Sequence, residues 1–424
     1  METIKKNIII VSIFLSLIIV FSGCTDEQPK PQDSEENSEE DESETRYDPC
    51  GNEIGNGNEI ISGPLGPEDE DIDNPFRSLT VHPTHPDVLI IGTERNGFLK
   101  SIDGGNNWIR LRRGLRHGNS GYPEIYDIAF SQSNPDIIYA ATLDGPGPLR
   151  GDYPSSIGGI YKSMDGGETW QRKNCGLENG WIFSIFVSAD NPNNVIIGIS
   201  GSETTFTGWD ISGKFFDGGI FRSTDGGGNW NRLNIAAYNN TNSYMMIRAE
   251  KSNPLNLYSF GTNFENLSQN VGFIKSMDGG STWTTFASEL REHGISYFDI
   301  SSNGTVIYAV DNFQIQKSID SGETWSEYNL FTSGYAIAVF PNNPNRVLFS
   351  KTTGLFLSTD GLITESKVIN TEGEKHISDI VIAPSNNNII YAITVGYDLY
   401  KSVDAGDNFT KIINLRDDVL NKIP

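Results

Sequence analysis

Ser163 to Trp170 read Ser-Met-Asp-Gly-Gly-Glu-Thr-Trp, and related octets occur seven times along the 424 residues. The other six begin at Ser101, Ser223, Ser276, Ser318, Ser358 and Ser402. Successive first serines are 62, 60, 53, 42, 40 and 44 residues apart. This period is typical of stacked supersecondary units that bury their apolar faces against one another. The octets therefore predict a repeat architecture.

Each octet lies between two short apolar runs, which is the pattern of a strand, a tight turn and a second strand. The Asp-Gly-Gly centre supplies the positive φ angles of the turn, and the carboxylate accepts hydrogen bonds from N–H groups of its own turn. One carboxylate per turn offers too few oxygens for a calcium site. We therefore interpret the octet aspartates as structural; they are Asp103, Asp165, Asp225, Asp278, Asp320, Asp360 and Asp404.

Upstream of the octets the chain carries a second recurring signal, an alternating apolar run, an Asn-Pro turn and another apolar run, clearest around Asn134-Pro135. Each unit then holds four strands, A to D, with the Asn-Pro turn between A and B and the octet between C and D. Seven such units predict an all-β fold, a single seven-bladed β-propeller. It should run from about Arg77 to near Leu415, with no strand shared between the chain's two ends.

The octets resemble the Asp-box, or BNR-repeat, signature Ser-x-Asp-x-Gly-x-Thr-Trp, and the resemblance covers most of residues 77–415. That family includes sialidases, xyloglucanase-type glycoside hydrolases, sortilin-type receptors and non-enzymatic surface proteins. The resemblance implies the propeller fold. It implies no particular activity, because the octet belongs to the scaffold.

Residues 1–24 have the pattern of a secretory signal: Lys5 and Lys6 precede an apolar run that ends at Ser22-Gly23-Cys24. The Ser-Gly-Cys end resembles the lipobox of prokaryotic lipoproteins, which implies cleavage before Cys24 and a lipid on its thiol. The alternative is an uncleaved membrane anchor, although the run is short for a span. Both alternatives place the rest of the chain outside the cytoplasm.

Residues 25–75 hold 18 Asp or Glu against only Lys30 and Arg46, with few apolar residues. Such a segment cannot bury enough surface to fold, and we expect a disordered acidic linker. The propeller, residues 76–424, is then mildly acidic, which argues against nucleic acid as a partner. We expect a monomer attached to the membrane through the lipid on Cys24.

Two further cysteines, Cys50 and Cys175, either pair with each other or remain free thiols. The five histidines are scattered, and no His, Cys and Asp residues stand at metal-ligand spacing. The sequence therefore predicts neither a metal nor a cofactor.

In a propeller the D–A and B–C loops share one end, which we call the front end, and the octets mark the other, the back end. The front loops carry aromatic and basic residues suited to a sugar or a peptide. The ligand-binding residues predicted here are Trp181, Trp209, Tyr126, Tyr297, Tyr335 and Arg116. The alternative is that these aromatic rings pack between blades.

Enzymatic activity has weaker sequence support. Phe76-Arg77 lacks the Ile-Pro that follows in the sialidase motif, whereas Glu94 stands where xyloglucanase-type enzymes place a catalytic aspartate. Glycoside hydrolysis needs a second carboxylate, for which Asp144 and Asp210 are candidates. We therefore expect a propeller that binds a glycan or a partner protein; the alternatives are a glycoside hydrolase and an assembly factor for a membrane complex.

Overall fold

A computed structural model describes residues 78–116, 122–143, 158–177, 180–203, 215–216, 218–235, 243–262, 272–286, 290, 295, 297–311, 314–328, 336–371 and 375–420. The predicted signal at 1–24 and the acidic linker at 25–75 lie outside these residues. Among the described residues, no helix is long and apolar enough to cross a membrane.

The described chain forms seven four-stranded antiparallel sheets. Blades 1 to 3 consist of β1 (Ser78–Val81), β2 (Leu89–Gly92), β3 (Phe98–Ser101) and β4 (Ile109–Leu111); β5 (Glu124–Phe130), β6 (Ile138–Leu143), β7 (Ile160–Ser163) and β8 (Gln171–Arg172); β9 (Ile182–Val187), β10 (Val195–Ile199), β13 (Gly219–Ser223) and β14 (Asn231–Arg232). Blades 4 and 5 consist of β15 (Ser243–Ala249), β16 (Leu257–Thr262), β17 (Gly272–Ser276) and β18 (Thr284–Phe286); β19 (Tyr297–Ile300), β20 (Ile307–Val310), β21 (Ile315–Ser318) and β22 (Ser326–Tyr328). Blades 6 and 7 consist of β23 (Ile337–Phe340), β24 (Asn343–Lys351), β25 (Gly354–Ser358) and β26 (Ser366–Asn370); β27 (Ile377–Ile382), β28 (Ile390–Thr394), β29 (Asp398–Ser402) and β30 (Thr410–Asn414).

Two further elements decorate the ring. The small hairpin β11 (Ser202–Glu203) and β12 (Phe215–Phe216) lies within the connection between β10 and β13, and the helical turn η5 (Arg416–Leu420) follows β30.

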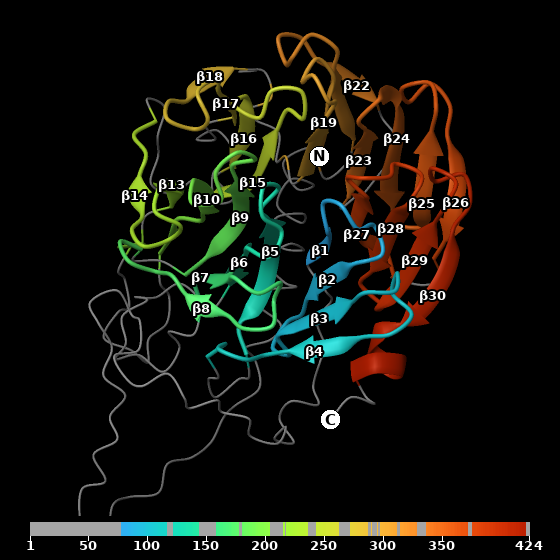
Figure 1. The fold of residues 1–424 in the computed structure, drawn as a ribbon. Helices are drawn as coiled ribbons and strands as arrows, with labels where there is room; N and C mark the ends of the chain where they lie inside the picture. Colours follow the sequence, from blue (N-terminus) through green and yellow to red (C-terminus); the bar gives the residue numbers. More distant parts are fainter. Residues whose placement is uncertain are drawn as a thin grey trace, which may run out of the picture. The chain divides into compact units, whose positions relative to one another are not determined.

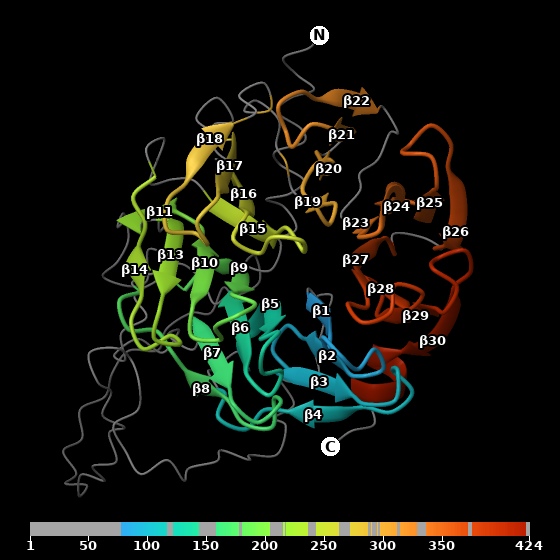
Figure 2. The ribbon, with the colours of Figure 1, turned by 45° about the horizontal axis from the view of Figure 1, so that its top comes forward.

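The first strand of each sheet faces a central axis, and these inner strands contact one another in turn from β1 to β27 and back to β1 (Figures 1 and 2). Every sheet uses strands consecutive in its own unit, so the ring closes with no strand borrowed between the two ends. The predicted seven-bladed propeller of four-stranded blades is confirmed.

The octet turns and the Asn-Pro turns lie at the same end of the propeller. In blade 2 the N–H of Gly166, in the octet, donates to the carbonyl of Asp136, in the A–B turn, at 2.9 Å. The corresponding bond is present in all seven blades, from Gly104 to Asp87 in blade 1 through Ala405 to Asn388 in blade 7. This shared end is the predicted back end.

The core lies between the blades, because each cluster of buried apolar side chains draws on two adjacent sheets. Between blades 1 and 2, for example, Ile90 and Phe98 pack with Ile125 and Tyr161. The octet tryptophan of blade 2, Trp170, stacks on Phe98 of blade 1 with ring centroids 4.1 Å apart. Each octet thus fixes its own turn and also fills the interface with the preceding blade.

Positions four and five of every octet adopt positive φ, and most are glycine, for which this region costs little. Three octets depart from the rule: Ser321 has φ 61°, Leu362 has φ 78° and Ala405 has φ 60°. Their side chains occupy the left-handed region against a steric penalty, so the surrounding turn must impose this conformation.

A tyrosine and a lysine connect many neighbouring blades. Tyr139 on β6 is fully buried, and its hydroxyl donates to the carbonyl of Pro192 in the next blade at 2.8 Å. Its cross-strand neighbour Lys162 lies over the ring at 5.1 Å and donates to the carbonyl of Gly226 in the next octet. Tyr308 with Lys317 repeats this arrangement, and beside Tyr391 the ammonium of Lys401 donates to the Asp87 carboxylate of the next blade at 2.8 Å. We call each of these pairs a tyrosine–lysine clamp.

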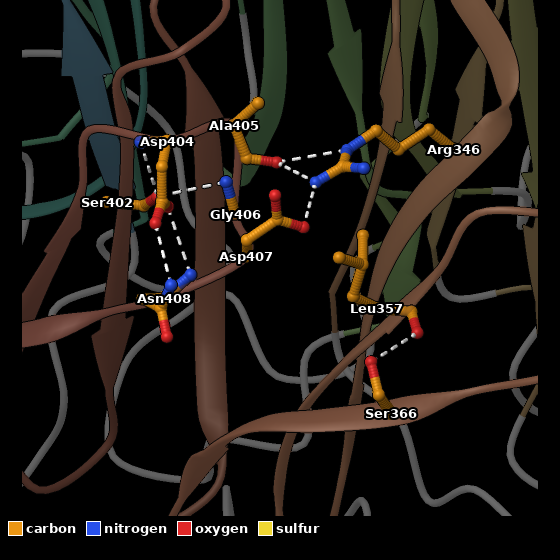
Figure 3. Close-up of polar contacts among 9 residues, drawn as sticks. All are labelled: Arg346, Leu357, Ser366, Ser402, Asp404, Ala405, Gly406, Asp407 and Asn408. Carbon is orange, nitrogen blue, oxygen red and sulfur yellow. Dashed lines mark hydrogen bonds and ion pairs between the residues drawn. The ribbon is translucent and has the colours of Figure 1, made fainter.

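Blade 6 has Leu357 where most other blades carry a lysine, and an arginine from elsewhere replaces it (Figure 3). The guanidinium of Arg346, on β24, donates to the carbonyl of Ala405 in the octet of blade 7 at 2.7 and 3.1 Å. It also pairs with Asp407 at 2.6 Å. A cation on the octet carbonyls is therefore kept although the sequence position of the cation has changed.

Candidate functional site: the front end of the central channel

The octet aspartates serve the turns that contain them. In blade 2 the carboxylate of Asp165 accepts from the Ser163 hydroxyl at 2.8 Å, the Thr169 N–H at 2.9 Å and the Thr169 hydroxyl at 2.6 Å. In blade 7 Asp404 accepts from Ser402 and Asn408 in the same way (Figure 3). The Asn408 side chain and backbone lower the pKa of Asp404 to about 2. These carboxylates are ionised and engaged, as scaffold residues should be.

The front end of the channel is the end opposite the octets, where the inner strands begin. Here the inner strands carry bulges, at Tyr126 in β5, Phe183 in β9 and Ser378 in β27. The bulge leaves each of these residues unpaired in the ladder and half-buried. The ring of Tyr126 meets that of Phe183 edge-on, with centroids 4.8 Å apart.

Trp181 lies just before β9, two residues before Phe183 in the sequence. It forms an isolated bridge with Leu143 at the end of β6, and its carbonyl accepts from the N–H of Ser200 at 3.0 Å. The indole is half-buried. Blades 2 and 3 together thus bring three of the chain's aromatic residues to the front end.

Below the mouth, three aspartates connect the inner strands of neighbouring blades. Asp127 accepts from its own strand, at Ile128 N–H, and from the next blade, at Ile185 N–H, both at 2.9 Å. Asp299 does the same with Ile300 at 2.9 Å and Val339 at 2.7 Å. Asp379 bonds Ile380 at 2.8 Å and Leu79 at 3.1 Å, which closes the ring between blades 7 and 1. We call these three residues the carboxylate staples.

A cation and a phenol lie among the staples. Arg248 on β15 pairs with Asp299 at 4.0 Å and lies over the Tyr297 ring at 5.8 Å, while the Tyr297 hydroxyl donates to Asp379 at 3.1 Å. The side chains of Arg248 and Asp299 are partly buried and keep 32% and 24% of their accessible surface.

Burial shifts the titration of the channel groups. Burial raises the pKa of Asp127 to about 6, against the opposing effects of Arg248 and the Ile185 N–H. Burial likewise raises the pKa of Asp299 and of Asp379. Burial and the nearby Asp379 raise the pKa of Tyr297, which therefore stays a neutral hydrogen-bond donor.

The sequence-predicted site residues fall into three groups. Tyr126 and Trp181 lie at the front end, and Tyr297 lies in the channel bonded to Asp379. Arg116 is half-buried after β4. Trp209, Tyr335, Asp144 and Asp210 lie outside the described residues.

Glu94 lies in the tight turn between β2 and β3 and is only 8% exposed. In this turn the Thr93 hydroxyl donates to the carbonyl of Gly97 at 2.7 Å. The Arg112 guanidinium donates to the side-chain oxygen of Asn96 at 2.6 Å. The structure thus places Glu94 in the turn between β2 and β3 with most of its side chain shielded from solvent.

Sequence reasoning missed the carboxylate staples and Arg248. A signal was available: Asp is followed by Ile at 127–128, 299–300 and 379–380, each time inside a mostly apolar inner strand. A charged residue in a strand whose neighbours are buried needs partners, and here the partners are backbone N–H groups of two blades.

Within the described ranges, no group of three or more His, Cys, Asp or Glu residues is placed to hold a metal ion. Cys175 is disulfide-bonded, while Cys50, the partner considered from the sequence, lies outside the described residues.

No family model matches the sequence, and no curated protein matches it. Solved structures share its fold. An ancestral GH74 enzyme superposes with a TM-score of 0.57 at 17% identity over 80% of this chain, which spans 46% of that enzyme. The structure of YCF48 bound to D1 peptide superposes with a TM-score of 0.53 at 13% identity. The match covers 78% of this chain and 94% of the YCF48 chain. The extracellular domain of the putative one component system BT4673 from B. thetaiotaomicron superposes with a TM-score of 0.51 at 16% identity. The match covers 75% of this chain and 39% of the BT4673 chain.

Proposed function

We propose that this chain is a ligand-binding propeller that captures a glycan or a peptide at the front end of its channel. The observation that carries the proposal is the half-buried Tyr126–Phe183 pair, which lies at strand bulges at the front ends of β5 and β9. Aromatic faces with polar groups nearby suit sugar rings and peptide side chains alike. The octet carboxylates at the back end are engaged in their own turns, so we do not propose them as ligand contacts.

The structural neighbours are compatible with both ligand classes. One is a GH74 enzyme and another was solved with a peptide bound. At 17% and 13% identity they share the fold with this chain.

A glycan array and a peptide array probed with residues 46–424, the compact unit that contains the propeller, test the proposal. We expect Tyr126→Ala or Phe183→Ala to weaken binding by about 1–3 kcal/mol, as loss of an aromatic hot spot does. Tyr328→Ala, which removes a ring from the outer strand β22, is the matched control and should bind normally. Equal binding by all three variants would place the ligand elsewhere.

Hydrolysis is the alternative activity, and Glu94 tests it. If the protein is a hydrolase, Glu94→Gln should abolish glycan hydrolysis while glycan binding is retained. If it only binds, neither the wild type nor the variant should hydrolyse the glycan. Release of reducing sugar from a bound glycan by the wild-type protein would contradict the binding proposal. The role of an assembly factor would instead show as a hit on the peptide array alone.

We also propose that the propeller works outside the cytoplasm, attached by a lipid on Cys24. The signal-like residues 1–24 support this, and so does the disulfide at Cys175, because disulfides persist in oxidising compartments. Cys24→Ser should move the protein from the detergent phase to the aqueous phase in Triton X-114 partitioning. Retention of the variant in detergent would favour an uncleaved anchor.

A further inference from the structure

A pocket of about 190 Å³ opens at the back end between blades 1 and 2, far along the strands from the proposed front site. Its apolar lining is Val88, Ile102, Phe130 and Pro135, and its charged or titratable lining is His82, Lys100 and Asp136; Gly166 completes the wall. The Lys100 ammonium donates to the carbonyl of Gly166 at 2.8 Å, so the cation is fixed at the edge of the pocket.

The same polar groups surround a buried phenol at three other blade interfaces. Tyr139, Tyr308 and Tyr391 donate to the carbonyls of Pro192, Pro344 and Pro86 at 2.8, 2.9 and 3.1 Å. The clamp lysines lie over these rings at 5.1, 5.4 and 5.3 Å. Each tyrosine pairs in register with its lysine across the second and third strands.

At the interface of blades 1 and 2 the lysine is present and the tyrosine is missing. Lys100 pairs in register with Ile90, the residue at the tyrosine position. A Cβ placed on Gly226 or Gly104 would meet a tyrosine hydroxyl at 3.2 or 3.3 Å, whereas one on Gly166 would meet nothing nearer than the Lys100 ammonium at 3.5 Å. The space beside Gly166 is therefore the space that a phenol takes in the other clamps.

Two other interfaces also lack the tyrosine, with Ile196 in blade 3 and Leu348 in blade 6, but arginines bridge them. Arg222 reaches Ser281 of the next octet at 2.5 Å, and Arg346 reaches Ala405 and Asp407. Lys100, by contrast, leaves room beside it, since it lines the pocket and does not fill it.

We propose that this pocket is a binding site for a phenol ring, with the ring between Phe130 and the aliphatic walls and its hydroxyl donating to the Pro135 carbonyl. The Lys100 ammonium would add a cation–π contact, as its counterparts do in the intact clamps. A pocket of this size is larger than the engineered apolar cavity of about 150 Å³ that takes up benzene. The ligand is either a free small phenol or a tyrosine side chain of a bound peptide.

The test uses p-cresol, the side-chain analogue of tyrosine, with the full-length protein in detergent, and saturation-transfer NMR to follow binding. Ile90→Tyr supplies the missing ring from within and should weaken p-cresol binding by about tenfold or more. Ile90→Leu is the matched control and should bind as the wild type does. Val88→Phe, which fills the pocket from its wall, is a second blocking variant should Ile90→Tyr fail to fold.

Loss of binding in both blocking variants with retention in Ile90→Leu supports the site. Equal binding by wild type and Val88→Phe overturns it, and so does an equal response to toluene, because toluene cannot donate to Pro135. A second arm with N-acetyl-tyrosine amide identifies the source of the phenol: competition with p-cresol indicates a peptide ligand, and p-cresol binding without competition indicates a free phenol. No p-cresol response at millimolar concentration refutes the proposal and leaves the front-end site untouched.

Discussion

At the scale of single residues, aspartate has two opposite environments in this fold. The octet aspartates lie in exposed turns where hydrogen bonds from their own segment stabilise the charge, as the lowered pKa of Asp103, about 2, reflects. The channel aspartates are buried, and burial raises their pKa by disfavouring the charged form. For Asp127, two backbone N–H groups stabilise the charged form and lower the pKa in part. The same side chain thus stabilises a turn in one place and joins two blades in another.

Asp165→Ala should lower the free energy of unfolding by about 1–3 kcal/mol, because the turn loses the acceptor for Ser163 and Thr169. Chemical denaturation monitored by tryptophan fluorescence measures this change. Met164→Ala is the control within the same octet, since Met164 is 68% exposed and should matter little. A stable Asp165→Ala protein that has lost ligand binding would show that this octet belongs to a functional surface.

Ala405→Gly should raise the free energy of unfolding by about 0.5–1 kcal/mol, because Ala405 is held at φ 60° and glycine adopts this region without steric cost. The turn keeps its contact with Arg346, which uses the backbone carbonyl (Figure 3). Ala392→Gly, in the middle of β28, should show the ordinary loss of about 0.5–1 kcal/mol. A loss of stability at both positions would mean that the octet does not impose the strained conformation.

At the scale of the structural element, each inner strand acts as both a part of its blade and a link to the next. The carboxylate staples do this in blades 2, 5 and 7, and Asp379 does it where the chain's first and last blades meet. Because no strand crosses that junction, the staple, the Tyr391–Pro86 bond and the Lys401–Asp87 pair replace the shared strand that would otherwise close the ring.

Asp379→Ala should therefore lower the free energy of unfolding by about 2–3 kcal/mol, since it leaves the N–H groups of Leu79 and Ile380 without an acceptor in a buried place. Hydrogen exchange should speed up first at these two amides. Ser378→Ala, at the neighbouring half-buried bulge, is the control and should cost less than half as much. Unchanged exchange at Leu79 in Asp379→Ala would show that the closure does not depend on the staple.

At the scale of the whole molecule, the two aspartate populations give opposite contributions to pH dependence. A carboxyl with a raised folded pKa binds more protons in the folded state, so Asp127, Asp299 and Asp379 add stability as the pH falls, for Asp127 through about 6. The octet carboxyls have lowered folded pKa values, so their contribution is complete above about 4 and is lost as the pH falls toward about 2.

We therefore expect stability to rise from pH 7 to about 5 and to fall below about 4, in urea denaturation series at fixed ionic strength. Asp127→Asn cannot titrate, so it should flatten the rise between pH 7 and 5 while leaving the loss at low pH unchanged. A wild-type protein whose stability falls steadily from pH 7 downward would show that the channel carboxyls are ionised in the fold.

The sequence by itself determined the architecture, because the octets and Asn-Pro turns are local signals: each fixes a turn with residues of its own segment, and their number sets the number of blades. It also determined that the octet aspartates belong to turns. Only the tertiary structure decided how blades meet. At one position of the second strand, Ile90 leaves a pocket, Tyr139 fills the corresponding space, and Leu348 goes with a bridging arginine. The outcome depends on residues some fifty positions away in the next blade, such as Pro135 and Pro192. The channel site has the same origin: Asp127, Arg248 and Asp379 are distant in sequence, and only closure of the ring brings their charges together.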